Sequence, residues 1–123
     1  MNKTRFHHVA VIVSDLDRSE LFYEQLLGLE RDKRPDLGFP GLFYSLGGGQ
    51  QLHLMQIDDP YDGYEQPAHG GRDHHFALAT DSLEMLVSRL DEAGVICTKS
   101  RSGRAAIFFR DPDGNAIEVI QPQ

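Results

Sequence analysis

The two halves of this sequence present the same order of structural signals, and this repetition limits the folds that the chain can adopt. Residues 6–13 (FHHVAVIV) and residues 74–80 (HHFALAT) each place a histidine doublet at the start of an apolar strand. A helix is expected after each strand, within residues 14–30 and within residues 81–94. Each helix is followed by further strands, about three in each half. The sequence therefore predicts two β-α-β-β-β modules, each roughly 50 residues long.

Capping residues and glycines set the expected ends of both helices. Polar residues at positions 14–17 can supply the N-cap of the first helix, and Gly28 is placed to end it. The second helix is expected to begin at Asp81 or Ser82 and to end at Gly94. Both helices thus have defined ends inside their modules.

Turn signals and a polar linker complete the predicted organisation. The Gly47–Gly49 run should join two strands of the first half, and residues 111–114 (DPDG) should form a tight turn in the second. Residues 58–72 are rich in Gly, Pro and acidic residues and are predicted to be a linker or flap between module one (about 5–57) and module two (about 73–122). An α+β fold follows, in which half-open, helix-backed sheets surround a concave site.

Composition excludes several classes of protein. Hydrophobic residues make up 40% and charged residues 25% of the chain, which is typical of a single folded domain spanning residues 1–123. The net charge of −7 argues against binding to nucleic acid. Cys97 is the only cysteine, so neither an intrachain disulfide nor a cysteine-rich zinc site can form. No stretch is apolar enough to span a membrane and no signal peptide is evident, so we expect a cytoplasmic protein.

Alternation along the strands places four polar residues on one set of faces. His8 and His53 belong to the first and last strands of module one, and His75 and Glu118 hold the same places in module two. The two members are 45 residues apart in the first module and 43 in the second. The opposite faces carry the larger apolar side chains: Val9, Val11, Leu52, Leu54, Phe76, Leu78, Ile117 and Val119. We expect this larger set to pack beneath the helices and the polar residues to line the concavity.

These four residues form a donor set that is typical of a divalent transition metal. Three neutral imidazoles and one carboxylate suit Zn²⁺, Fe²⁺, Mn²⁺, Ni²⁺ or Co²⁺. Side chains on strands hold their geometry while leaving coordination positions open to a substrate. The sequence therefore predicts a metal centre formed by His8, His53, His75 and Glu118.

Three segments carry a resemblance to a known superfamily: residues 8–30 (HVAVIVSDLDRSELFYEQLLGLE), 75–95 (HFALATDSLEMLVSRLDEAGV) and 108–120 (FFRDPDGNAIEVI). They resemble the two module openings and the closing hairpin of the vicinal oxygen chelate superfamily. Its members include glyoxalase I, bleomycin-resistance proteins, fosfomycin-resistance enzymes and extradiol dioxygenases. The resemblance covers nearly all of the chain apart from the linker.

The resemblance also assigns roles to individual histidines. It implies that His8, His75 and Glu118 occupy the usual ligand positions, and that His53 occupies the fourth, which varies among members. The doublet partners His7 and His74 should point to the opposite face, as hydrogen-bonded or partly exposed residues. His69 in the linker is expected to be exposed to solvent, unless it belongs to a flap that closes over substrate.

A glyoxalase-type lyase or isomerase is the function that the resemblance implies, acting on a small substrate with vicinal oxygens through a metal-stabilised enediolate. Glu118 and His53 are the candidates for proton transfer. Glutathione-using members place Arg four residues after the first ligand and Asn four after the second, where this chain has Ile12 and Ile57. We therefore expect a small oxygenated substrate in a more apolar pocket. Short members are commonly homodimers, and a homodimer is expected here.

Three alternatives stay open. The triad of His8, His75 and Glu118 alone would suit an Fe(II) ring-cleaving-type dioxygenase, with His53 as an acid–base residue. Thiol transfer, as in fosfomycin resistance, would need an anion-binding cluster that the sequence does not make evident. A drug- or metabolite-binding resistance protein without catalysis would need an aromatic groove. Candidates for its lining are Phe39, Phe43, Tyr44, Tyr61 and Tyr64.

Overall fold

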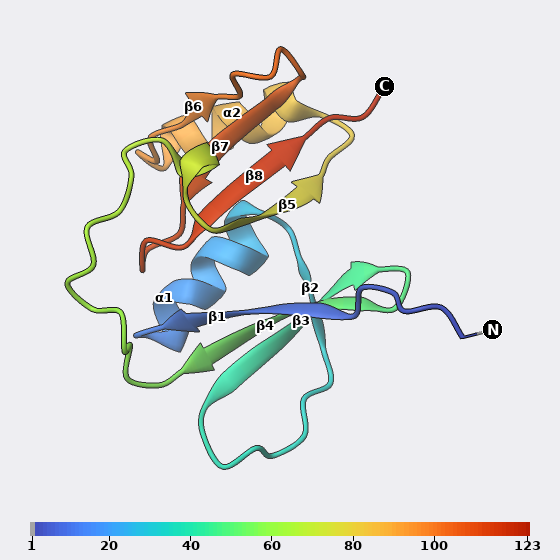
Figure 1. The fold of residues 1–123 in the computed structure, drawn as a ribbon, viewed down its shortest axis with the longest axis vertical. Coiled ribbons are helices and arrows are strands. Elements are labelled where there is room, and N and C mark those ends of the chain that lie inside the picture. The colour runs from blue at the N-terminus through green and yellow to red at the C-terminus, as the bar shows by residue number, and fades with distance from the viewer. Residues whose placement is uncertain (1) are drawn as a thin grey trace. The chain divides into compact units, whose positions relative to one another are not determined.

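The computed structural model describes residues 2–123, which divide into two compact units (Figure 1). The first unit ends at Pro60 and the second begins at Tyr61, so the boundary falls inside the predicted linker. Each unit holds one four-stranded mixed sheet together with one main helical segment. This arrangement confirms the predicted α+β fold.

The first unit follows the predicted order of elements. They are β1 (His8–Val13), α1 (Leu16–Glu20), the π-helix η1 (Leu21–Leu26), β2 (Glu30–Asp32), β3 (Gly41–Gly47) and β4 (Gln50–Gln56). The strand order is β1-β4-β3-β2, with β1 parallel to β4 and the other neighbours antiparallel. The Asp15 side chain caps α1. The predicted helix within residues 14–28 is present, and its second half is a wider π-helix, in which the backbone N–H of Leu27 donates to the carbonyl of Phe22.

The second unit repeats this organisation. Its elements are the 3-10 turn η2 (Gly70–Arg72), β5 (His75–Ala79), α2 (Leu83–Glu92), β6 (Thr98–Lys99), β7 (Ala106–Arg110) and β8 (Ala116–Ile120). The strand order is β5-β8-β7-β6, again with the first pair parallel and the others antiparallel. Ser82 caps α2 by accepting a hydrogen bond from the backbone N–H of Met85 at 3.2 Å. Gly94 follows the helix with a φ of 76°, a left-handed conformation that suits glycine.

Strand register shows that the two units are equivalent residue by residue. Ala10 on β1 pairs with His53 on β4, and Ala77 on β5 pairs with Glu118 on β8. His8 and His75 each lie two residues before these alanines, so each pair of polar residues occupies the same place in its sheet. The third strand then contributes an aromatic partner to the last strand at the same level, which is Phe43 for His53 and Phe108 for Glu118.

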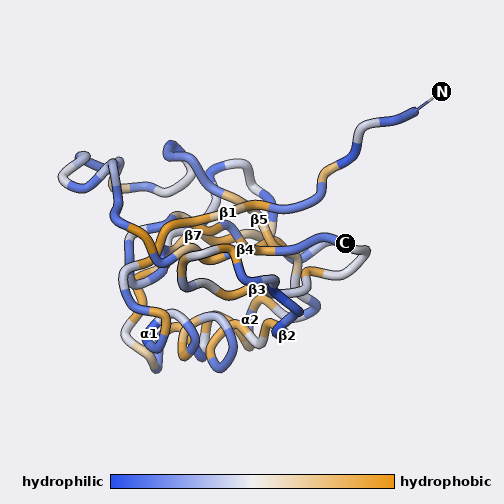
Figure 2. Tube along the Cα trace, turned by 90° about the horizontal axis from the view of Figure 1, so that it is seen from below, coloured by the Kyte–Doolittle hydropathy of each residue, from blue (hydrophilic) through white to orange (hydrophobic). Residues whose placement is uncertain are grey.

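Aromatic packing fixes the helical segment of the first unit against its sheet. The rings of Tyr23 on η1 and Tyr44 on β3 are fully buried, with 6.0 Å between their centroids. The Tyr44 hydroxyl donates to Glu24 Oε2 at 2.9 Å, and burial together with this carboxylate raises the pKa of Tyr44. In Figure 2, α1 lies on one side of the strands β1 and β4 of its own unit.

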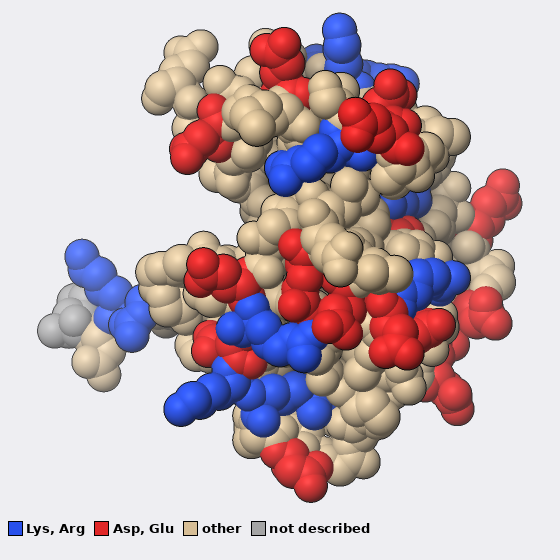
Figure 3. All heavy atoms as spheres, turned by 180° about the vertical axis from the view of Figure 1, so that it is seen from behind, with Lys and Arg blue, Asp and Glu red and all other residues tan. Residues whose placement is uncertain are grey.

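Burial follows the predicted division of the strand faces in β1 and β4, whereas β8 is buried on both faces. Leu52, Leu54 and Ile117 are fully buried, whereas His8 and Ala10 are exposed. Acidic and basic side chains are interspersed on the face drawn in Figure 3. No helix that the structure describes within residues 2–123 is both long and apolar enough to cross a membrane.

Candidate functional site

His8 and His53 form the first of two pairs, one in each unit. Their rings are stacked, with 4.0 Å between centroids and 16° between planes. His53 also stacks on Phe43, with its centroid 3.5 Å away and the planes 3° apart. The parallel pairing of β1 with β4 brings the two histidines together, since His53 lies opposite Ala10 and the side chain of His8 lies on the same face.

A hydrogen-bonded chain assigns the tautomer of His53. The Gln51 amide nitrogen donates to Asp32 Oδ2 at 2.9 Å, so the amide oxygen faces the other way and lies 2.9 Å from His53 Nε2. Nε2 therefore carries the proton of this ring and Nδ1 carries the lone pair. Burial, followed by the nearby His8, His7 and Arg34, lowers the pKa of His53 to about 4. The imidazole is neutral at pH 7, which is the form that binds a metal.

His7 and His74, the doublet partners, behave differently from each other. Nδ1 of His7 lies 2.8 Å from Nδ1 of His8, so the prediction that His7 points to the opposite face is wrong. The physical reason is that β1 begins at His8, and strand alternation does not orient a residue that precedes the strand. His74 has a fully exposed side chain, as expected of a bystander.

His75 and Glu118 form the second pair. Nδ1 of His75 lies 2.9 Å from the backbone carbonyl oxygen of Asp73, and because a carbonyl only accepts, Nδ1 is the donor. In the neutral ring Nε2 then carries a lone pair, and it faces Glu118 Oε1 at 3.4 Å. Glu118 is buried, with 5% of its surface exposed. A cation between these two atoms would be attracted by both.

Arg110 on β7 ties the segment before β5 to the second sheet. Arg110 Nη1 donates to Asp73 Oδ2 at 2.9 Å and to the Gly114 carbonyl at 2.8 Å, while its Nη2 donates to the Pro67 carbonyl at 2.6 Å. The Gln66 side chain donates to the same Gly114 carbonyl at 2.9 Å. The C-terminal half of the predicted linker is therefore a tethered flap, which we define as residues 66–73.

This flap covers part of the face that carries Glu118. A Cβ added to Gly70 would lie 3.3 Å from the Cβ of Ala116 and 3.6 Å from that of Phe108. Glycine thus allows the flap to approach β7 and β8 closely. Ala116 is buried beneath it, and the expectation that this face of β8 simply lines an open concavity is wrong at that residue.

His69 lies in the flap and is held near the second pair. Its Nδ1 is 2.9 Å from Thr98 Oγ1, and its ring meets the ring of Phe108 edge-on with 5.0 Å between centroids. The His75 ring meets Phe108 in the same way at 5.1 Å. The expected solvent exposure of His69 is wrong, because the side chain is half-buried against the second sheet.

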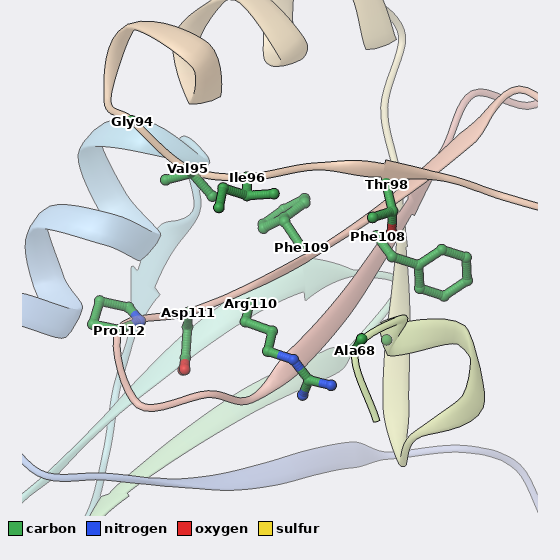
Figure 4. A pocket seen from close by; sticks show the side chains of 11 residues that line it. Ala68, Gly94, Val95, Ile96, Thr98, Phe108, Phe109, Arg110, Asp111 and Pro112 are labelled. Carbon is green, nitrogen blue, oxygen red and sulfur yellow. The ribbon is translucent and has the colours of Figure 1, made fainter. Parts of the chain in front are cut away.

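A cavity of about 430 Å³ lies in the second unit beside the flap and β7 (Figure 4). Ala68, Gly70 and Phe108 border it on the flap side. Figure 4 shows Ile96 and Phe109 side by side along one wall. Its size is within the range of small-molecule sites, which is roughly 300–1,000 Å³.

The aromatic residues considered for a binding groove do not form one surface. Phe43 and Tyr44 are buried, whereas Tyr61 and Tyr64 are exposed. Phe39 lies beneath a guanidinium, with the Cζ of Arg34 5.0 Å from its ring centroid.

The two pairs have the donors that a divalent metal needs, although neither pair is a complete site by itself. Within residues 2–123, the structure gathers no three His, Cys, Asp or Glu side chains into a group that could hold a metal ion. The first pair offers a neutral imidazole with an assigned lone pair. The second offers a buried carboxylate facing an imidazole whose other nitrogen donates to a backbone carbonyl, which is the usual arrangement of a metal-binding histidine.

Several neighbours that orient these residues are not evident from strand periodicity. Gln51 and Asp73 act through hydrogen bonds that depend on the folded chain. Arg104 is a third such neighbour, since its Nη2 lies 3.3 Å from Glu118 Oε2. The run of basic residues at positions 99–104 is the sequence signal that could have indicated it.

The comparisons with known proteins point to one superfamily. The sequence pattern of the Glyoxalase/Bleomycin resistance protein/Dioxygenase superfamily matches residues 5–119. The uncharacterized protein YwkD of Bacillus subtilis (strain 168) is 32% identical over 122 residues, 94% of each chain. The mitochondrial methylmalonyl-CoA epimerase of Homo sapiens is 31% identical over 128 residues, 96% of this chain and 73% of the epimerase. The crystal structure of TnmS3, an antibiotic binding protein from Streptomyces sp. CB03234, is 26% identical with a TM-score of 0.73, and the match covers 100% of this chain and 99% of TnmS3.

Proposed function

We propose that this chain, which belongs to the glyoxalase/bleomycin resistance protein/dioxygenase superfamily, is a divalent-metal-dependent lyase or isomerase of the glyoxalase type. Its substrate would be a small molecule with two neighbouring oxygens. The resemblance to a methylmalonyl-CoA epimerase supports this reaction class, because epimerisation and glyoxalase-type isomerisation both begin by removing a proton next to a carbonyl group.

The observation that carries the proposal is the second pair. A lone pair of His75 and an oxygen of Glu118 face each other at 3.4 Å, and the ring orientation is fixed by the Asp73 carbonyl. Such an arrangement is favourable around a cation, which both donors can bind.

The proposed ligands are His8, His53, His75 and Glu118, with both pairs serving one metal ion. The equivalent register of the two units supports a common role, since each pair occupies the same positions in its sheet. A bound divalent ion would act as a Lewis acid toward the two substrate oxygens.

Proton transfer would fall to residues of the chain itself. Glu118 is buried and acceptor-only when ionised, which suits a base that takes a proton from the carbon next to the carbonyl group. The low pKa of His53, about 4, makes this ring a neutral acceptor at pH 7 rather than an acid.

A binding protein without catalysis is the second candidate. The similarity to TnmS3 favours it. This candidate needs neither a metal nor the carboxylate of Glu118.

Solvent exchange distinguishes the two candidates. Protein loaded with Zn²⁺, Mn²⁺, Ni²⁺, Co²⁺ or Fe²⁺ is incubated in D₂O with a panel of 2-hydroxycarbonyl compounds, and deuterium uptake at the carbon next to the carbonyl is followed by NMR. We expect uptake by the loaded wild type and a loss of at least about a hundredfold in Glu118→Gln, the usual size of a general-base effect. Binding of panel members without uptake under any metal, and equally by Glu118→Gln, would contradict the enzyme and support the binding protein.

A further inference from the structure

The guanidinium of Arg104 reaches the carboxylate that we propose as a metal ligand. Its Nη2 lies 3.3 Å from Glu118 Oε2, which is not the oxygen that faces His75. The side chain of Arg104 is 58% exposed, whereas that of Glu118 is 7% exposed. Arg104 therefore extends from solvent to a buried anion through one long contact, and little packing holds it there.

The loop that carries Arg104 is positively charged and internally ordered. Residues 99–104 (KSRSGR), between β6 and β7, contain three cations and no carboxylate in a chain of net charge −7. Ser102 Oγ accepts hydrogen bonds from the backbone N–H of Arg104 at 3.2 Å and from its Nε at 3.0 Å. Ser100 Oγ lies 2.8 Å from Ser102 Oγ. These contacts aim the guanidinium while they leave its outer nitrogens for a charged partner.

We infer that Arg104 recognises an anionic group of the substrate, and that this substrate carries a carboxylate or phosphate next to its chelated oxygens. The inference rests on the proposed function. Without metal, Glu118 is the anion that pairs with Arg104. Once Glu118 is a ligand, a divalent ion compensates its charge and its attraction for the guanidinium falls. Arg104 is then free to bind an anionic group through two parallel hydrogen bonds.

This exchange of partners has two consequences of opposite sign. Removing the guanidinium should strengthen metal binding, because a cation that competes for Glu118 Oε2 is lost. The same change should weaken the binding of an anionic substrate. If Arg104 only shaped the loop, its removal would weaken the binding of both metal and substrate or change neither affinity.

Two probes and a matched control make the test. Glycerate and 3-phosphoglycerate share a hydroxy-carboxylate chelating pair and differ by a phosphate. Both are titrated calorimetrically into Zn²⁺-loaded protein at fixed ionic strength, and Zn²⁺ affinity is measured separately. Arg104→Gln is compared with Arg101→Gln, which removes the same charge from the same exposed loop, and with Arg104→Lys.

In Arg104→Gln we expect 3-phosphoglycerate to bind at least about tenfold more weakly, with glycerate changed less than about twofold and Zn²⁺ bound several-fold more tightly. Arg101→Gln should leave all three affinities near wild type. Arg104→Lys should recover part of the phosphate affinity, since it restores the charge without the planar fork.

Equal losses of 3-phosphoglycerate affinity in Arg104→Gln and Arg101→Gln would overturn the inference, because loop charge alone would then explain them. Weaker Zn²⁺ binding in Arg104→Gln would also overturn it, by showing that the arginine supports the ligand geometry. A wild type that binds no metal would refute the proposed function and this inference with it, whereas metal binding with unchanged anion affinity in Arg104→Gln would refute the inference alone.

Discussion

The imidazole of His53 is held neutral by its surroundings. It stacks between His8 and Phe43, and its Nε2–H donates to Gln51. Burial and the positive charges nearby place its pKa at about 4, below its ordinary value of 6.5. At pH values between these two pKa values, the ring is therefore neutral in the folded chain and protonated in the unfolded chain.

This difference predicts a pH-dependent contribution to stability. Above pH 6.5 the ring is neutral in both states, and the contribution is fully present. Between pH 6.5 and 4 the unfolded state binds the extra proton, so the free energy of unfolding falls as the pH falls. We expect the free energy of unfolding to fall by about 2 kcal/mol over this range. This is less than the full pKa shift would give, because the ring is partly exposed to solvent. Urea unfolding of chelator-treated protein at several pH values measures it.

His53→Gln is the control, since glutamine does not titrate. Its free energy of unfolding should show a shallower pH dependence than that of the wild type in this range. Parallel curves for the two proteins would show that His53 has the same pKa in both states.

Residue types and strand alternation were enough to predict the two pairs. His8 with His53, and His75 with Glu118, each lie on one face of a sheet as alternation requires. The tautomers could not be predicted, because they depend on Asp73 and on the chain from Gln51 to Asp32. Arg104 was missed for a related reason: its contact with Glu118 spans a loop whose conformation the periodicity does not determine.

The flap shows how one side chain, that of Arg110, can hold a segment of irregular backbone in place. Arg110 accepts no hydrogen bond but donates to two backbone carbonyls and to Asp73. Burial alone would raise the pKa of Asp73, but the hydrogen bonds from Arg110 and from the His74 backbone give a net lowering. Asp73 also supplies the carbonyl that orients His75, so the tether and the second pair are connected.

Breaking this tether should loosen the flap. Arg110→Gln removes the donors of Asp73 Oδ2 and of the Pro67 carbonyl and one of the two donors of the Gly114 carbonyl. We expect a loss of about 2–3 kcal/mol in the free energy of unfolding. Limited proteolysis between residues 61 and 66 should become faster in this variant. Arg72→Gln, in which an exposed arginine of η2 is replaced, is the matched control. Equal stability and equal cleavage rates in the two variants would contradict the assigned role of Arg110.

Elements were predicted well where a local signal defines them. Asp15 and Ser82 cap the helices, and the Gly47–Gly49 and 111–114 turns join the expected strands. The π-helical end of the first helix and the attachment of the flap could not be predicted. Both depend on tertiary contacts, such as the packing of Tyr23 on Tyr44 and the bonds of Arg110.

In the whole molecule, the proposed metal site draws on both units. The first unit would supply two imidazoles, and the second an imidazole and a carboxylate. Neither half is sufficient for tight binding of a divalent transition metal, which usually needs at least three protein ligands. If the four residues bind one ion, as we propose, metal binding depends on substitutions in both units.

The metal content of the protein tests the proposed four-residue ligand set. Protein is loaded with Zn²⁺ or Fe²⁺, desalted, and assayed for metal per chain as wild type, as His53→Gln in the first unit and as Glu118→Gln in the second. We predict about one ion per chain in the wild type and an affinity at least about tenfold lower in each variant. Loss in Glu118→Gln with full retention in His53→Gln would favour the dioxygenase-like triad. No metal in the wild type, or none lost in either variant, would contradict the proposed four-residue ligand set.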